Sequence, residues 1–189
     1  AEKGKMTDEE VQAASDRLNG ASSLAELKDA AIVIEAIVER LEVKRTLFAD
    51  LEGIVHDDCI LATNTSSISV TAIAARLRLP QRLVGMHFFN PVPLMALVEV
   101  ISGLATERAV ADTVFATAES WGKNPVHAKS TPGFIVNRVA RPFYAEGLRL
   151  LSEQAADAAT LDAVMRESGG FRMGPFELMD LIGHDVNFP

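Results

Sequence analysis

Short apolar runs alternate with helical segments along the first two thirds of the chain, and this alternation limits the possible folds more than any other feature. The runs predicted as strands are residues 31–34, 59–62, 83–86, 97–101 and 124–128. The segments predicted as helices before and between them are residues 7–18, 42–54, 69–77 and 106–121. Strands that alternate with helices at this spacing predict an α/β domain, in which a mostly parallel sheet has helices on its faces.

The pattern changes after Ser130, because no strand candidate follows it. The helices predicted there cover residues 132–151, 160–167 and 175–182. Pro142 predicts a kink or a break in the first of them, since proline removes a backbone donor from a helix. We therefore place a boundary near residues 128–131. Residues 1–129 are predicted to form part of an α/β domain, and residues 130–189 part of an all-α domain.

The composition suits a globular protein and limits its partners. With 189 residues, of which 48% are hydrophobic, the chain can bury one or two modest cores. The formal net charge is −8, from 18 Lys and Arg against 26 Asp and Glu. This balance argues against broad nucleic-acid binding, which needs a basic surface. A local group of lysines could still hold an anionic small ligand.

The single cysteine, Cys59, permits no intrachain disulfide. That fits a reducing compartment, and we predict a cytoplasmic location. The sequence has no recognisable signal peptide, and no apolar run approaches the roughly 18–20 residues that a membrane span needs. The histidines are isolated and one cysteine cannot build a thiolate site, so we predict no metal site.

Polar residues that follow the predicted strands are the first candidates for a functional site. In open α/β sheets, ligands bind outside the carboxyl ends of the strands. Three groups occupy such positions: Glu39 with Lys44, the polar loop 64–67, and His87 with Asn90.

His87 and Glu99 can each be interpreted in two ways. An imidazole at a strand end can move a proton near neutral pH, but His87 could equally be a core histidine bonded to the backbone. Glu99 lies between two valines, where a carboxylate is costly to bury without a partner. It either faces solvent or orients His87 and stabilises the charged imidazolium.

Ser66 and Asn137 also have a structural alternative. The loop 64–67 could simply form a turn that caps the next helix, as such residues do well. Asn137 could be an exposed amide in a helix. A hydrolase built from Ser66, His87 and Glu99 is conceivable, but Ser66 is not in the G-x-S-x-G setting that exposes a nucleophile.

Five motifs in order make the chain similar to a known family. They are residues 34–39 (IEAIVE) with Lys44, 64–68 (NTSSI), 87–93 (HFFNPVP) leading to 97–100 (LVEV), 131–138 (TPGFIVNR) and 173–178 (MGPFEL). Together they resemble the 3-hydroxyacyl-CoA dehydrogenases. The resemblance spans nearly the whole chain. It implies a Rossmann-type domain followed by an all-α domain that mediates homodimerisation.

The resemblance also implies an activity and roles for individual residues. The reaction would be NAD-dependent oxidation of the 3-hydroxyl of an acyl-CoA, with His87 as general base and Glu99 orienting it. Ser66 and Asn137 would hold the substrate oxygens. The residues implied to line the nicotinamide end of the cofactor are Glu39, Lys44, Ser66 and Asn90. Lys3 matches a lysine that meets the CoA phosphates.

The family's G-x-G-x-x-G turn, and the acidic residue about 20 positions after it, should precede residue 1. The resemblance therefore implies that these residues lack the first βαβ unit of the sheet, and we predict that they bind NAD weakly or not at all by themselves. Residues 169–188 are similar to the branch that acts on 3-hydroxyadipyl-CoA in phenylacetate degradation. 3-Hydroxybutyryl-CoA is the rival substrate. The alternatives are a non-catalytic binding or dimerisation module and a related hydroxyacid dehydrogenase.

Overall fold

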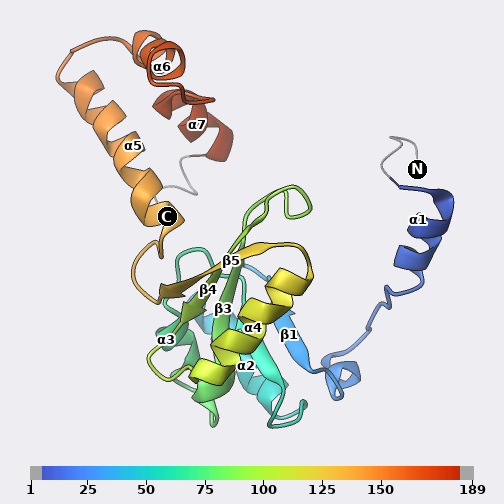
Figure 1. Ribbon diagram of the computed structural model, residues 1–189. Helices are drawn as coiled ribbons and strands as arrows, with labels where there is room; N and C mark the ends of the chain where they lie inside the picture. The colour runs from blue at the N-terminus through green and yellow to red at the C-terminus, as the bar shows by residue number, and fades with distance from the viewer. Residues whose placement is uncertain (1–5, 184–189) are drawn as a thin grey trace. The chain divides into compact units, whose positions relative to one another are not determined.

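A computed structural model describes residues 6–183 of the chain (Figure 1). The chain divides into two compact units, residues 1–127 and residues 128–189. Within the described residues, no helix is both long enough and apolar enough to cross a membrane.

The first unit is built around a sheet of five strands in the order β1-β2-β3-β4-β5. The strands are β1 (Ile32–Glu35), β2 (Ile60–Thr63), β3 (Leu83–Phe88), β4 (Leu97–Ser102) and β5 (Asn124–Lys129). β1, β2 and β3 are parallel, whereas β4 runs antiparallel to β3. The predicted α/β fold is confirmed, and the pairing of β4 with β3 departs from parallel order. Its reversal follows from the short connection 89–96, since a parallel crossover needs a dozen or more residues.

Four α-helices and two 3₁₀ turns complete the first unit. They are α1 (Asp8–Ser15), η1 (Leu24–Leu27), α2 (Leu41–Glu52), α3 (Val70–Ala74), η2 (Pro80–Arg82) and α4 (Arg108–Ser120). Thr7 caps α1 in a capping box with Glu10. The predictions that this helix reaches residue 18 and that α3 reaches residue 77 are wrong. α1 buries no side chain that could extend it by packing.

Alternation along the strands gives the sheet two different faces. One face packs against α4, which lies in front of the sheet in Figure 1. The residues of this core are Ile60, Ala62, Val84, Met86, Val98, Val100, Ala111, Val114 and Ala118. The opposite face carries Leu61, Leu83 and Ile101, all without solvent exposure, and packs against α3. By the same alternation, His87 and Glu99 lie on the α3 face.

The second unit is helical, with α5 (Val136–Ser152), α6 (Ala158–Glu167) and α7 (Pro175–Ile182). α5 begins later than predicted, because Gly133 and Phe134 have positive φ angles and form a turn before it. Of the kink or break predicted at Pro142, the break does not occur, because α5 continues through this residue. α5 packs closely on α7, since a Cβ at Gly147 would lie 2.8 Å from Pro175 Cγ.

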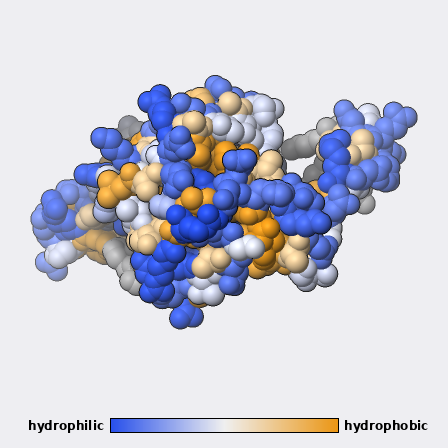
Figure 2. Space-filling view, turned by 90° about the horizontal axis from the view of Figure 1, so that it is seen from below, coloured by the Kyte–Doolittle hydropathy of each residue, from blue (hydrophilic) through white to orange (hydrophobic). Residues whose placement is uncertain are grey.

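An apolar pocket of about 690 Å³ lies within the second unit, between α5, α7 and residues 171–173. The rings of Phe143 and Phe171 stack at its wall with their centroids 4.8 Å apart. Apolar side chains are also exposed at the surface of the molecule. On the face shown in Figure 2, they form several patches among hydrophilic residues.

Candidate active site

The candidate site gathers polar side chains at the carboxyl ends of the parallel strands. Glu35 and Thr63 are the last residues of β1 and β2 and are partners in the strand register. The turn 64–68 follows Thr63 directly. His87 was predicted to follow β3 but lies within it, because the strand extends to Phe88. Polar residues on the α3 face thus meet at one edge of the sheet.

His87 and Glu99 form a buried pair across two strands. They are register partners in the antiparallel β3–β4 ladder. Nδ1 of His87 lies 2.7 Å from Oε2 of Glu99. The Glu99 side chain is fully buried, so the interpretation of Glu99 as a solvent-facing strand residue is wrong. The ring of Phe89 flanks the imidazole at a centroid distance of 4.6 Å.

This pairing defines the chemistry available to the imidazole. A buried carboxylate is stable only with partners, and hydrogen bonding to an imidazole provides one. Donation of Nδ1–H to Glu99 leaves the ring lone pair on Nε2, the arrangement of an imidazole base oriented by an acid. The pair can therefore accept a proton at Nε2 and offset the positive charge that results.

Asn64 joins the ends of three strands. Its side-chain oxygen accepts a hydrogen bond from the backbone N–H of Phe88 at 2.8 Å. The backbone N–H of Asn64 donates to the backbone carbonyl of Glu35, also at 2.8 Å. Asn64 therefore fixes the start of the turn 64–68 relative to β1 and β3.

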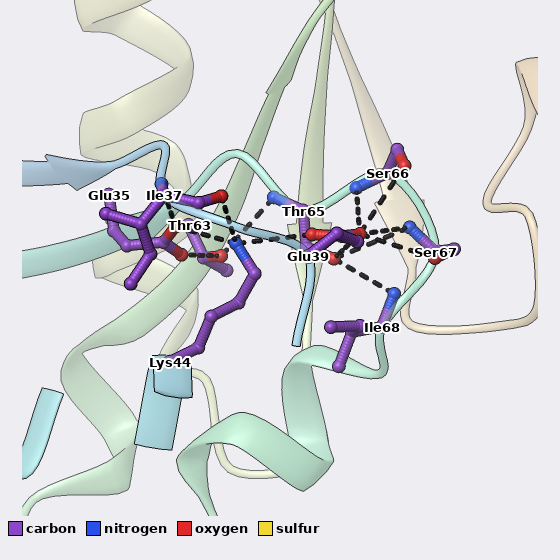
Figure 3. Close-up of polar contacts among 9 residues, drawn as sticks. All are labelled: Glu35, Ile37, Glu39, Lys44, Thr63, Thr65, Ser66, Ser67 and Ile68. Atoms are coloured by element: carbon purple, nitrogen blue, oxygen red, sulfur yellow. Dashed lines mark hydrogen bonds and ion pairs between the residues drawn. The ribbon is translucent and has the colours of Figure 1, made fainter. Parts of the chain in front are cut away.

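Glu39 accepts hydrogen bonds from the three central residues of this turn, Thr65, Ser66 and Ser67 (Figure 3). Its Oε1 lies 2.6 Å from Thr65 Oγ1, 2.9 Å from the Ser66 nitrogen and 3.1 Å from the Ser67 nitrogen. Burial raises the pKa of the Glu39 carboxyl, but hydrogen bonds from Thr65 and Ser66 and the charge of Lys44 lower it by more. The net shift is downward from the ordinary value of 4.5.

Lys44 is buried behind Glu39. Its side chain is only 1% exposed, and Nζ lies 2.6 Å from Glu35 Oε1 and 3.2 Å from Glu39 Oε2. In this structure the ammonium is neutralised by two internal carboxylates. A cofactor approaching from the surface would therefore meet Glu39 before Lys44.

The other predicted site residues are placed separately. Ser66 is half-buried in the turn beside Glu39, and Asn90 is exposed two residues after β3. Asn137 belongs to the second unit, where it is half-buried in the first turn of α5. Lys3 lies outside the described residues, so its assigned role stays a prediction.

Glu35 and Thr63 were not predicted as site residues. Glu35 directly follows the predicted strand 31–34, and its side chain is completely buried. The sequence did contain a feature that pointed to such a residue. Lys44 lies among the apolar positions of a helical stripe, and an ammonium buried there needs an acidic partner. Around these residues, and throughout the described chain, no group of three or more His, Cys, Asp or Glu could hold a metal ion.

The exposed rim of the site offers polar groups to a ligand. Glu39 keeps 37% of its side chain exposed, and Ser66 and Asn90 also reach the surface at the carboxyl ends of the strands. Carboxylate, hydroxyl and amide groups of this kind can form hydrogen bonds with the hydroxyls and amides of a polar ligand. The site's position agrees with the rule that ligands of open α/β sheets bind at this edge.

The fold and this edge of the sheet are those of a Rossmann-like α/β protein, and comparison with known proteins identifies the family. Residues 1–131 match the family model "3-hydroxyacyl-CoA dehydrogenase, NAD binding domain". Residues 133–188 match the model "3-hydroxyacyl-CoA dehydrogenase, C-terminal domain". The chain belongs to the 3-hydroxyacyl-CoA dehydrogenase family, which confirms the resemblance noted from its motifs.

Individual relatives agree with this assignment. The chain is 53% identical to 3-hydroxyadipyl-CoA dehydrogenase of Escherichia coli over 98% of its own length and 39% of the relative's. It is 45% identical to a probable 3-hydroxybutyryl-CoA dehydrogenase of Bacillus subtilis, over 98% of its own length and 65% of the relative's. It thus spans less than two thirds of either protein.

Solved structures show the same fold. A structure described as 3-hydroxybutyryl-CoA dehydrogenase from Escherichia coli superposes with a TM-score of 0.96 at 53% identity, covering 99% of this chain and 40% of that one. (S)-3-Hydroxybutyryl-CoA dehydrogenase from Ralstonia eutropha gives a TM-score of 0.95 at 40% identity, covering 98% of this chain and 65% of that one.

Proposed function

We propose that the natural protein carrying this chain is an NAD-dependent dehydrogenase that oxidises the 3-hydroxyl of a (3S)-3-hydroxyacyl-CoA to a 3-oxoacyl-CoA. The observation that carries the proposal is the buried pair of His87 and Glu99 at 2.7 Å. Family membership supports the same reaction. Residues 1–129 would contribute to the NAD-binding domain and residues 130–189 to the all-α domain.

His87 would act as the general base of this reaction. The alcohol must lose its proton as the hydride leaves C3, so a base is needed within hydrogen-bond reach of the hydroxyl. The hydroxyl proton passes to Nε2 of His87, and Glu99 offsets the charge of the imidazolium. Ser66 and Asn137 would hold the substrate oxygens.

NAD, when bound, supplies the acceptor for the hydride from C3. Glu39, Ser66 and Asn90 would hold its nicotinamide end. Lys44 would act there through Glu39, given its burial behind that carboxylate. The rigid turn 64–68 supports this role, because its backbone is fixed by Glu39 and Asn64 before any ligand binds.

For the substrate we propose 3-hydroxyadipyl-CoA, within the degradation of phenylacetate. Support comes from the 53% identical relative of that name. The shorter 3-hydroxybutyryl-CoA is the second candidate, since the Bacillus relative and the superposing structures bear that name.

The assay that tests this proposal follows NAD reduction with both CoA thioesters and with the corresponding free 3-hydroxy acids. We expect turnover of the thioesters, higher kcat/KM for 3-hydroxyadipyl-CoA, and little or none of the free acids. Preferential oxidation of the free acids would instead support a hydroxyacid dehydrogenase. Absence of any NAD-linked oxidation by the natural protein would favour a non-catalytic module.

We also propose that the protein is a cytoplasmic homodimer that associates through residues 130–189. Val139 and Leu181 support this, because these two apolar residues of the second unit have exposed fractions of 73% and 70%. The thiol of Cys59 is free and buried, in keeping with a reducing compartment. Sedimentation analysis of the protein and of Val139→Asp would test the dimer; a monomeric parent protein would contradict it.

A further inference from the structure

We propose that Glu35 is a positioning residue of the site. It fixes Lys44, Lys44 fixes the carboxylate of Glu39, and Glu39 fixes the turn that carries Ser66. The consequence for catalysis rests on the proposed dehydrogenase function, whereas the structural linkage stands on the contacts themselves (Figure 3).

The first step of the linkage is the carboxylate of Glu35, both oxygens of which accept hydrogen bonds. Oε1 accepts hydrogen bonds from Lys44 Nζ at 2.6 Å and from the Ile37 backbone nitrogen at 2.7 Å. Oε2 accepts one from Thr63 Oγ1 at 2.7 Å. Since Glu35 and Thr63 end neighbouring strands in register, the sheet itself holds this carboxylate in place.

The second step is the ammonium of Lys44, which bridges two carboxylates. The side chains of Lys44 and Glu35 are 1% and 0% exposed, so neither charge can turn to solvent. A buried charge is retained only with close partners. Glu35 therefore anchors an ammonium whose other contacts are Oε2 of Glu39, at 3.2 Å, and the carbonyl oxygen of Ile37, at 3.5 Å.

The third step depends on the two oxygens of Glu39, which contact different partners. Oε2 faces Lys44, and Oε1 receives the N–H groups of Ser66 and Ser67 and the hydroxyl of Thr65. The ion pair with Lys44 therefore sets the rotation of the carboxylate, and this rotation aims Oε1 at the turn. Three groups with two negative charges and one positive charge thus tie the end of β1 to Ser66.

The same first unit contains a matched control. Glu52 accepts hydrogen bonds from the backbone nitrogens of Arg78 and Leu79 and lies 3.6 Å from the buried Arg82. Its side chain is 10% exposed. Glu52→Gln therefore removes a carboxylate with a similar environment but no connection to Glu39.

The test is amide hydrogen exchange in the protein without ligands, comparing Glu35→Gln with Glu52→Gln. We expect Glu35→Gln to accelerate exchange at Ser66 and Ser67 about tenfold or more relative to the amides of β2, because local opening of the turn becomes easier when its anchor is lost. Glu52→Gln should leave both amides unchanged. Unaltered exchange at Ser66 and Ser67 in folded Glu35→Gln, or equal acceleration by Glu52→Gln, overturns the proposal.

A second variant keeps the test decisive if Glu35→Gln does not fold. Glu35→Gln combined with Lys44→Met removes both buried charges and so restores a balanced interior. A purely structural role predicts a stable protein with normal exchange at Ser66 and Ser67. The positioning role predicts a stable protein in which both amides still exchange faster, because Oε2 of Glu39 has lost its anchor.

Kinetic measurements separate this proposal from the proposed function. In an active natural protein, kcat/KM should fall about tenfold or more in Glu35→Gln, in line with losses at other orienting residues. An inactive parent protein would refute the dehydrogenase assignment and leave the exchange result to decide the linkage. An active parent with undiminished kcat/KM in Glu35→Gln would refute the catalytic consequence.

Discussion

His87 and Glu99 face each other directly across the β3–β4 ladder, with Nδ1 of the imidazole 2.7 Å from Oε2 of the carboxylate. Both side chains are buried on the face of the sheet that packs against α3. Strand register alone brings them together. A shift of one residue in either strand would place one of them on the opposite face, among the apolar residues beneath α4.

The charge of Glu99 is expected to matter more than its shape. Glu99→Gln retains the volume of the side chain but cannot offset the charge of an imidazolium. We predict that turnover falls roughly 100-fold, the lower end of what positioned proton transfer contributes. Steady-state kinetics would measure this, with Glu107→Gln at the exposed N-cap of α4 as the control. Equal turnover in Glu99→Gln and the parent protein would contradict the assignment.

The turn that carries Ser66 should respond to acid. The folded-state pKa of Glu39 lies below its ordinary value of 4.5, so ionisation of this group stabilises the fold above that pH. The contribution is lost as the pH falls through the folded-state pKa. The amide resonances of Ser66 and Ser67 should therefore titrate together with a midpoint below 4.5. A higher midpoint, or the same transition in Glu39→Gln, would be inconsistent with this description.

Gly85 should tolerate no side chain. It lies opposite Ile101 in the ladder, and an added Cβ would be 2.8 Å from Ile101 Cβ and 3.1 Å from Val70 Cγ2. Gly85→Ala should lower the free energy of unfolding by about 1–3 kcal/mol, as overpacking of a core does. Gly20→Ala provides the control, because its Cβ would meet nothing within 4 Å. Equal stabilities of the two variants in urea denaturation would contradict the close packing of Ile101 and Val70 against Gly85.

Asp162 should stabilise the second unit by capping α7. Its buried carboxylate accepts hydrogen bonds from the backbone nitrogens of Phe176 at 2.9 Å and Glu177 at 3.1 Å. Asp162→Ala should cost about 1–2 kcal/mol, the upper range for loss of a helix cap. The control is Asp180→Ala, which changes an exposed residue of α7 and should have little effect. Thermal unfolding followed by circular dichroism would detect the difference, and similar melting temperatures would argue against the cap.

Local patterns in the sequence were sufficient for much of the fold. The apolar runs predicted the five strands, and α7 begins and ends at the predicted residues, Pro175 and Ile182. The ends of helices were harder to predict, because packing decides how far a helix continues. α1 and α3 end at Ser15 and Ala74, before the predicted residues 18 and 77. Pro142, where a kink or a break was predicted, leaves α5 unbroken.

The site was only partly predictable for the same reason. The positions of His87 and Glu39 after apolar runs marked them as candidates, but the burial of Glu99 depends on a register that one sequence does not reveal. Glu35 ends β1 and Lys44 lies in α2, nine residues further on, so they meet only because the chain turns between these two elements. Their pairing is a property of the packed structure.

The most direct test of the general-base role is the turnover of His87→Gln in the natural protein, measured together with its affinity for NAD. Glutamine keeps a polar side chain at this position but cannot accept the hydroxyl proton at neutral pH. We predict that kcat falls by about 10²–10⁴-fold while NAD affinity stays within about twofold of the parent value. Oxidation of the 3-hydroxyacyl-CoA at the parent rate by His87→Gln would contradict the role assigned to the imidazole.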